Sequence, residues 1–159
     1  FLPAPPDQIA GLTQIRLTGA KLTQPLDPQV HEYRAVRDAG ARGVTVAGFP
    51  NLFLLLGPNT GQGHTSAVFM IESQIQHVLS CLRILARDKA DTIEVSEAAQ
   101  RRYNDALQRR LRRAVWSEGG CDSWYLDAAG VNRTLWPGFT FEYWARTRRA
   151  RPGDYAMLR

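Results

Sequence analysis

The chain has 159 residues, of which 44% are hydrophobic and 22% are charged, a size and composition typical of one globular domain. Its apolar runs all fall well short of the roughly 20 residues that a membrane-spanning helix requires, so the sequence predicts no membrane span. The formal net charge of +5 comes almost entirely from arginine, because Lys21 and Lys89 are the only lysines.

The two cysteines, Cys81 and Cys121, lie far apart and belong to no CxxC or Cys/His cluster. We therefore expect free thiols, a cytoplasmic location and no metal site. Cys81 lies between Leu79 and Leu82 on a predicted helix, which favours a buried thiol. His31 and His77 have no partner pattern and are expected to be structural or exposed.

Residues 1–43 predict an irregular lead, because prolines and other turn residues interrupt every periodic stretch. We expect the ordered domain to span residues 44–159. The continuously apolar run 52–56 predicts a strand that is covered on both faces.

A glycine-rich turn follows at residues 57–63, and its three glycines allow tight backbone and the close approach of a ligand. A helix is then expected from Thr65 or Ser66, both acceptable N-caps, to about Arg87. Because the first N–H groups of a helix lack intrahelical partners and carry the positive end of the dipole, this junction can hold an electron-rich group.

The long helix carries apolar residues at spacings of three and four, which predicts one face turned toward a core. These residues are Val68, Ile71, Ile75, Val78, Leu79, Leu82 and Leu85.

Four elements are expected in the second half. Residues 92–95 alternate as a short strand does, and Ser96 begins a second helix to about Trp116, with Ala99, Tyr103, Leu107, Leu111 and Val115 as its buried face. Segments 123–126 and 133–136 predict a β-hairpin, and a short helix covers Thr140 to about Arg148. The fold class is therefore α/β, or α+β if the segment is taken by itself.

Two blocks of sequence carry a family resemblance. The first is GFPNLFLLLGPNTGQGHTS at residues 48–66, and the second is CDSWY at residues 121–125 with the LDAAGVNRTLWPGFTFEYWARTRRARPGDY that follows. Both resemble the C-terminal segment of FAD-dependent, NAD(P)H-using monooxygenases of the Baeyer–Villiger and flavin-containing monooxygenase superfamily. Neither glycine-rich dinucleotide fingerprint, GxGxxG or GxGxxA, is present. The chain is therefore expected to be the last third of a longer enzyme and to be inactive alone.

The resemblance implies a two-dinucleotide-binding fold, in which residues 44–159 are the C-terminal part of the FAD-binding domain. It implies FAD and NADPH as cofactors, and transfer of one oxygen atom from O2 to a small ketone, amine or thioether. The expected partners are that substrate, O2 and the remainder of the same polypeptide.

The resemblance also assigns residues to roles, although it places no catalytic residue in this segment. The flavin is expected to lie against Gly57, Pro58, Asn59, Thr60 and Gly61, with backbone N–H groups facing a flavin carbonyl. The residues that would border the substrate cavity are Gln62, His64, Thr65 and Ser66. Trp124 is expected beside NADP.

Each assignment has a simpler alternative. Asn59 can be a turn residue that satisfies its own backbone, His64 can order the turn, and Trp124 can be a core residue of the hairpin. The arginines at 109–113 and 146–151 could make the chain a basic polyanion-binding module. Arginines at a helix C-terminus also stabilise the helix by compensating the negative end of its dipole. This structural role accounts for the first cluster, so we expect no nucleic acid partner. The chain could also be an inactive orphan fragment.

Overall fold

The computed structural model describes residues 41–61, 66–114, 125–126 and 130–158. The chain divides into the units Phe1–Arg34 and Ala35–Arg159, and every described residue lies in the second. The predicted lead at 1–43 therefore falls almost wholly outside the described residues, and its boundary remains a prediction.

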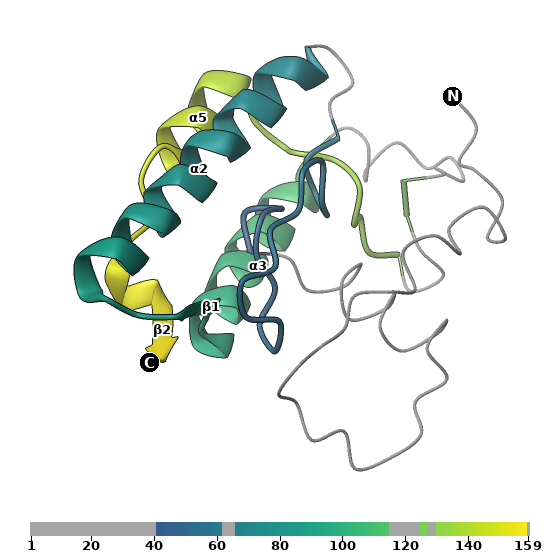
Figure 1. The fold of residues 1–159 in the computed structure, drawn as a ribbon. Helices are drawn as coiled ribbons and strands as arrows, with labels where there is room; N and C mark the ends of the chain where they lie inside the picture. The colour runs from purple at the N-terminus through teal and green to yellow at the C-terminus, as the bar shows by residue number, and fades with distance from the viewer. Residues whose placement is uncertain (1–40, 62–65, 115–124, 127–129, 159) are drawn as a thin grey trace, which may run out of the picture. The chain divides into compact units, whose positions relative to one another are not determined.

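Helices dominate the described unit (Figure 1). In chain order the elements are α2 (Ala67–Asp88), β1 (Thr92–Val95), α3 (Glu97–Leu111), α5 (Thr140–Thr147), the 3-10 turn η2 (Pro152–Asp154) and β2 (Tyr155–Leu158). Helices α2 and α5 lie side by side. The predicted mixture of helices and strands is confirmed. Within the described ranges, no helix combines the length and apolar character needed to cross a bilayer.

The two strands form one antiparallel pair, in which Thr92 lies opposite Leu158 and Val95 lies opposite Tyr155. Strand β1 has the predicted bounds, whereas β2 was not predicted. Asp154, the last residue of η2, accepts hydrogen bonds from Arg42 and Arg102 at 3.0 and 2.6 Å. These charge-assisted bonds hold the start of β2 in place beside β1.

Helix α2 has nearly its predicted bounds, but it buries a different face from the one expected. The buried residues are Met70, Ser73, Gln74, His77, Cys81 and Ile84. Of the predicted core face, Val68, Ile75, Leu79 and Leu82 are exposed. The reason lies in the polar groups of the inner face: Gln74 and His77 form hydrogen bonds to the 43–56 loop, to α5 and to β2. Such groups cannot be buried without these partners.

Helix α3 begins as predicted, because the Ser96 hydroxyl accepts a bond from the Ala99 N–H at 3.3 Å. It ends at Leu111, five residues before the expected end at Trp116, and short i to i+3 bonds follow at Arg113 and Ala114. The predicted buried residues Ala99, Leu107 and Leu111 are buried. Val115 and Trp116 lie outside the described residues. Helix α5 confirms the predicted short helix from Thr140.

The predicted strand at 52–56 is wrong. Residues 52–56 are irregular, and Leu55 and Leu56 are exposed. A strand requires a neighbouring strand, but the Leu54 N–H donates to the carbonyl of Val44 and the Leu56 N–H donates to the side chain of Gln74. The apolar run thus has no sheet partner among the described residues.

The predicted hairpin is also wrong in its second arm. Leu126 and Asn132 form a single antiparallel bridge, while Leu135 forms a parallel bridge with Gly61. The Asn132 carboxamide accepts from the N–H groups of Thr134 and Leu135 at 3.1 and 3.0 Å, which bends the backbone here. Ser123, Trp124 and residues 127–129 lie outside the described residues.

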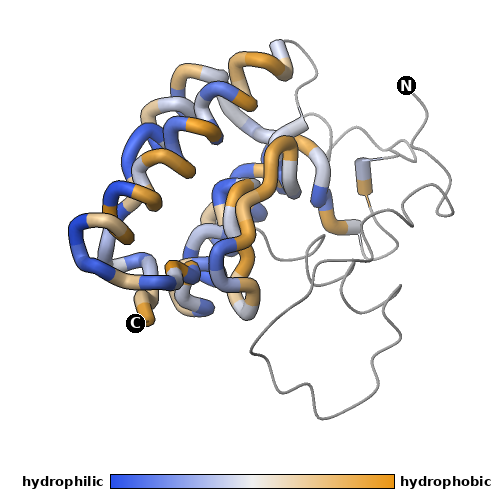
Figure 2. The backbone as a smooth tube through the Cα atoms, in the orientation of Figure 1, coloured by the Kyte–Doolittle hydropathy of each residue, from blue (hydrophilic) through white to orange (hydrophobic). Residues whose placement is uncertain are grey.

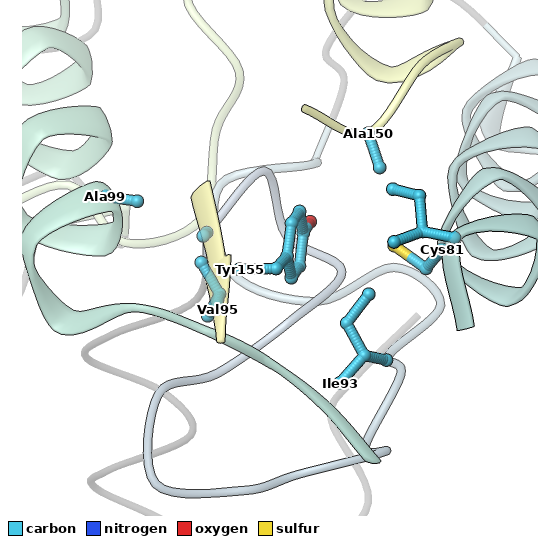
Figure 3. Close-up of a cluster of buried hydrophobic side chains, with 8 residues drawn as sticks. Cys81, Ile93, Val95, Ala99, Ala150 and Tyr155 are labelled. Atoms are coloured by element: carbon cyan, nitrogen blue, oxygen red, sulfur yellow. The ribbon is translucent and has the colours of Figure 1, made fainter. Parts of the chain in front are cut away.

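Two clusters of buried side chains form the core. The first joins α2, both strands and α3 (Figure 3) and contains Ala41, Cys81, Ile84, Ile93, Val95, Ala99, Ala150 and Tyr155. The second contains Met70, Leu107, Leu111, Trp136 and Tyr143. Cys81 is a buried free thiol, as predicted, and burial raises its pKa to about 11.

Candidate functional site

The turn that follows the apolar run has an unusual backbone. Leu56 and Asn59 have φ values of 53° and 56°. This left-handed region is common for asparagine but costly for leucine. Inside the turn, the Thr60 hydroxyl donates to the carbonyl of Gly57 at 2.7 Å. The surrounding structure must therefore hold residues 56–60 in this shape.

Backbone hydrogen bonds to residues 133–136 supply much of that support. The N–H of Asn59 donates to the carbonyl of Arg133 at 3.0 Å, and the N–H of Gly61 donates to that of Thr134 at 2.8 Å. The N–H of Trp136 returns a bond of 2.9 Å to the carbonyl of Gly61. The two segments, more than 70 residues apart in sequence, therefore form one rigid unit.

The side chain of Asn59 adds two further bonds. Its Nδ2 donates to the carbonyls of Asn132 and Leu135 at 2.9 and 3.2 Å, and the residue is buried. Asn59 thus bridges two distant segments rather than satisfying its own backbone. Asn132 is itself buried, and its Nδ2 has no hydrogen-bond partner among the described residues. Within the described ranges, one amide donor beside the turn is thus left without a hydrogen bond.

Two glycines of the turn allow close contacts between protein backbones. A Cβ on Gly57 would lie 2.5 Å from the carbonyl oxygen of Gly43, and one on Gly61 would lie 2.7 Å from that of Thr134. The glycines at 57 and 61 are therefore required by neighbouring protein segments, whereas the sequence had suggested the approach of a ligand.

Gln74 of helix α2 links the residue before the turn to the segment at Gly43. Its Oε1 accepts from the N–H of Leu56 at 2.9 Å, and its Nε2 donates to the carbonyl of Gly43 at 3.1 Å. Sequence analysis did not identify Gln74. The available signal was a pair of polar residues, Gln74 and His77, which lie three positions apart on one face of the helix.

The predicted site residues are only partly described. Gly57, Pro58 and Gly61 are half-buried, whereas Asn59 and Thr60 are buried. The expectation that backbone N–H groups of the turn face a cofactor is wrong for Asn59 and Gly61, because both donate to protein carbonyls. The residues Gln62, His64, Thr65 and Trp124 lie outside the described residues.

Ser66, the N-cap of α2, is described and exposed, and its side chain makes no capping bond. The first turn of α2 also has no acidic residue. By contrast, α3 has the capping Ser96 and an acidic Glu97. The positive end of the α2 dipole is therefore not compensated by its own first turn, and it suits an electron-rich group.

The arginine clusters are partly engaged in ion pairs. Glu142 of α5 accepts bonds from Arg110 at 2.6 and 2.8 Å and from Arg146 at 2.8 Å. The Arg110 hydrogen bonds are the main cause of the lowered pKa of the Glu142 carboxyl. The guanidinium of Arg110 also lies 5.5 Å from the centre of the Trp136 ring. These contacts give Arg110 and Arg146 structural roles and weaken the polyanion-binding alternative.

His77 lies buried between α2, α5 and β2. Its Nδ1 lies 2.8 Å from the carbonyl of Thr147 and its Nε2 lies 2.6 Å from the hydroxyl of Tyr155. Because a carbonyl can only accept, Nδ1 carries the proton and Nε2 accepts from Tyr155. Burial lowers the His77 pKa to about 4, against the opposing effect of the Thr147 hydrogen bond. His77 is thus a structural histidine, as expected.

The His77 pKa predicts a loss of stability in mild acid. Folding lowers the His77 pKa from 6.5 to about 4, so the unfolded chain binds a proton at this residue before the folded chain does. The contribution of neutral His77 to the free energy of unfolding is therefore complete above pH 6.5 and is lost as the pH falls toward 4. The loss between about pH 8 and pH 5 is roughly 2 kcal/mol. Chemical denaturation of the chain and of His77→Gln should show this slope in the parent and a smaller one in the variant. Equal slopes would contradict a neutral His77.

Known proteins place these features in context. No protein-family model matches the chain. The chain is 57% identical over 117 residues to a protein of Pseudomonas aeruginosa named Baeyer–Villiger monooxygenase, and 46% identical over 119 residues to one of Streptomyces coelicolor with the same name. These alignments cover 73% and 74% of this chain but only 22% and 23% of the relatives.

A solved structure shares the fold. The oxidized steroid monooxygenase bound to NADP superposes with a TM-score of 0.67 over 80% of this chain, at 23% sequence identity. The match covers 24% of that protein. The chain therefore spans about a quarter of the length of the proteins that it matches.

Proposed function

The chain belongs to the Baeyer–Villiger and flavin-containing monooxygenase superfamily, and we propose that it forms part of the flavin-binding domain of an NADPH- and O2-dependent monooxygenase. In that role the turn 57–66 and the N-terminus of α2 lie against the flavin. The observation that carries this proposal is the rigid turn before an uncapped helix N-terminus.

The described residues fit a flavin in two respects. The first-turn N–H groups of α2 receive no capping bond from the Ser66 side chain, and that turn contains no acidic residue, so they can stabilise electron density on a flavin carbonyl. The Asn132 amide beside the turn has a buried donor that finds no partner in the described part of the chain. The flavin supplies the redox chemistry with O2, while Asn59 and Gln74 fix the turn that positions it.

The residue roles follow from this arrangement. Gly57, Pro58 and Gly61 provide the half-buried surface of the turn, while Asn59 and Thr60 act from within it. We assign Gln62, His64, Thr65 and Ser66 to the edge of the substrate cavity and Trp124 to the NADP side. The expected substrate is a small ketone, amine or thioether, in a cytoplasmic enzyme. The remainder of a longer polypeptide supplies the dinucleotide fingerprints that this chain lacks.

A chimera tests the proposal. The aligned segment of the Pseudomonas aeruginosa relative is replaced by the matching residues of this chain. The purified chimera is expected to hold FAD in stoichiometric amount and to consume O2 in an NADPH-dependent manner. The unaltered relative serves as the control. A chimera that folds with the circular dichroism spectrum of the control, yet holds no FAD, would show that this segment does not serve a flavin site.

A further inference from the structure

The outward side of α2 carries a stripe of apolar side chains that no described residue covers. Val68, Ile75, Leu79 and Leu82, here called the outer stripe, are between 38% and 61% exposed. Their spacings of seven, four and three residues place them on one side of the helix. Apolar positions along α2 appear in orange in Figure 2. At 1.5 Å per residue the outer stripe extends over about 21 Å.

The opposite side of α2 is already committed to this unit. Gln74 and His77 are fully buried and bonded to the 43–56 loop, α5 and β2, and the Ser80 hydroxyl accepts from the N–H of Ala150 at 3.0 Å. The helix cannot rotate to bury its outer stripe without breaking these bonds. Both sides of α2 are therefore suited to burial. The side with Gln74 and His77 is buried within this unit, and the outer stripe is suited to burial against a segment outside it.

A second observation comes from the apolar run before the turn. Leu55 and Leu56 are 52% and 48% exposed, although the run is typical of a strand covered on both faces. Patches of exposed large apolar side chains mark contact surfaces. Two elements on either side of the turn thus expose the residues that they were expected to bury.

The length of the relatives identifies the occupant. This segment corresponds to 22% and 23% of the two Baeyer–Villiger monooxygenases, and to 24% of a solved structure that keeps its fold. More than three quarters of such a polypeptide lies outside the segment and is covalently linked to it. Tethering gives that portion an effective concentration that a second copy or a separate protein lacks.

We propose that the outer stripe of α2 is the surface on which the remainder of the monooxygenase polypeptide packs. The inference rests on the proposed function, because the occupant is the portion that carries the dinucleotide-binding parts. Contact along this helix places the packed portion near the turn 57–61, since the turn precedes α2 in the chain and Leu56, the residue before the turn, donates to Gln74.

Cysteine labelling tests this packing. Ile75→Cys and Leu79→Cys are made in the 159-residue chain and in the chimera, and maleimide labelling rates are compared with those of the parents. Gln76→Cys is the matched control, because Gln76 is exposed on another side of the helix. Labelling of the two stripe positions is expected to be slower by about tenfold or more in the chimera, while labelling at 76 is unchanged.

Other outcomes are decisive in the opposite direction. Equal labelling of the stripe in both proteins would overturn the proposal, as would protection that appears only at high concentration of either protein, which would indicate a second copy. The FAD content of the same chimera separates the two claims. If the stripe is protected but the chimera holds no FAD, the packing surface is supported and the flavin role is rejected. If the chimera holds FAD but the stripe is not protected, the flavin role is supported and the packing surface is rejected.

Discussion

Replacement of Gly61 by valine is expected to cause a large loss of bound flavin. A Cβ at position 61 would lie 2.7 Å from the carbonyl oxygen of Thr134, so the turn and residues 133–136 would have to separate. That movement breaks the reciprocal bonds of Gly61 with Thr134 and Trp136. Overpacking of this kind costs about 1–3 kcal/mol, which, if it is lost from binding, corresponds to a roughly fivefold to 150-fold weaker FAD affinity.

The measurement is the FAD dissociation constant of the chimera that carries each variant. Gly61→Ala should show a smaller effect in the same direction. Gly153→Ala is the matched control, because no heavy atom lies within 4 Å of a Cβ built on Gly153. If Gly61→Val binds FAD as the parent does, the turn has no part in holding the flavin.

Replacement of Tyr143 by alanine is expected to have the largest effect on stability. The side chain is buried in the second core cluster, and its ring meets Trp136 edge to face at 5.2 Å. Its hydroxyl donates to the carbonyl of Arg42 at 2.6 Å. The cavity left by an aromatic residue costs about 3–5 kcal/mol of unfolding free energy. Denaturant titration measures the difference.

Two variants separate the causes at Tyr143. Tyr143→Phe removes only the hydroxyl and should cost about 1–2 kcal/mol. Trp144→Ala removes a neighbouring aromatic residue that is 41% exposed and should cost less than about 1 kcal/mol, part of it from the cation–π contact with Arg148. A similar cost for Trp144→Ala and Tyr143→Ala would contradict the assignment of Tyr143 to the core.

Local sequence signals predicted the helices well. The Ser96 cap, the acidic first turn and the apolar spacing of α3 are all determined within a few residues, and β1 shows its period over four residues. The predicted strand at 52–56 failed for a different reason. Its apolar run indicates burial, but burial as a strand requires neighbouring strands, which the described part of the chain does not provide.

The face of α2 could not be predicted from hydrophobicity alone. The apolar side chains and the bonded polar side chains lie on different sides, and bonds from Gln74 and His77 decide which side faces this unit. Periodicity counts apolar residues and does not detect where a buried amide finds its partners. The same limit hid β2, whose position depends on pairing with a strand 60 residues earlier.

The sequence predicted the turn of the candidate site but not the distant segments that bond to it. The glycines and Asn59 identified the position of residues 57–61 by their conformational preferences. The partners of that turn, at residues 132–136, are distant in sequence and bond mainly through backbone groups. No residue pattern encodes a backbone carbonyl, so the bonds of Arg133 and Thr134 to the turn could not be predicted.

The most direct test of the flavin role is a crystal structure of the FAD-loaded chimera. We expect the pyrimidine edge of the flavin ring to lie at hydrogen-bond distance, about 3 Å, from backbone N–H groups of residues 57–66 other than Asn59 and Gly61, or from those of the first turn of α2. The turn should keep its bonds to residues 133–136. A flavin ring that contacts neither the turn nor the N-terminus of α2 would contradict the account.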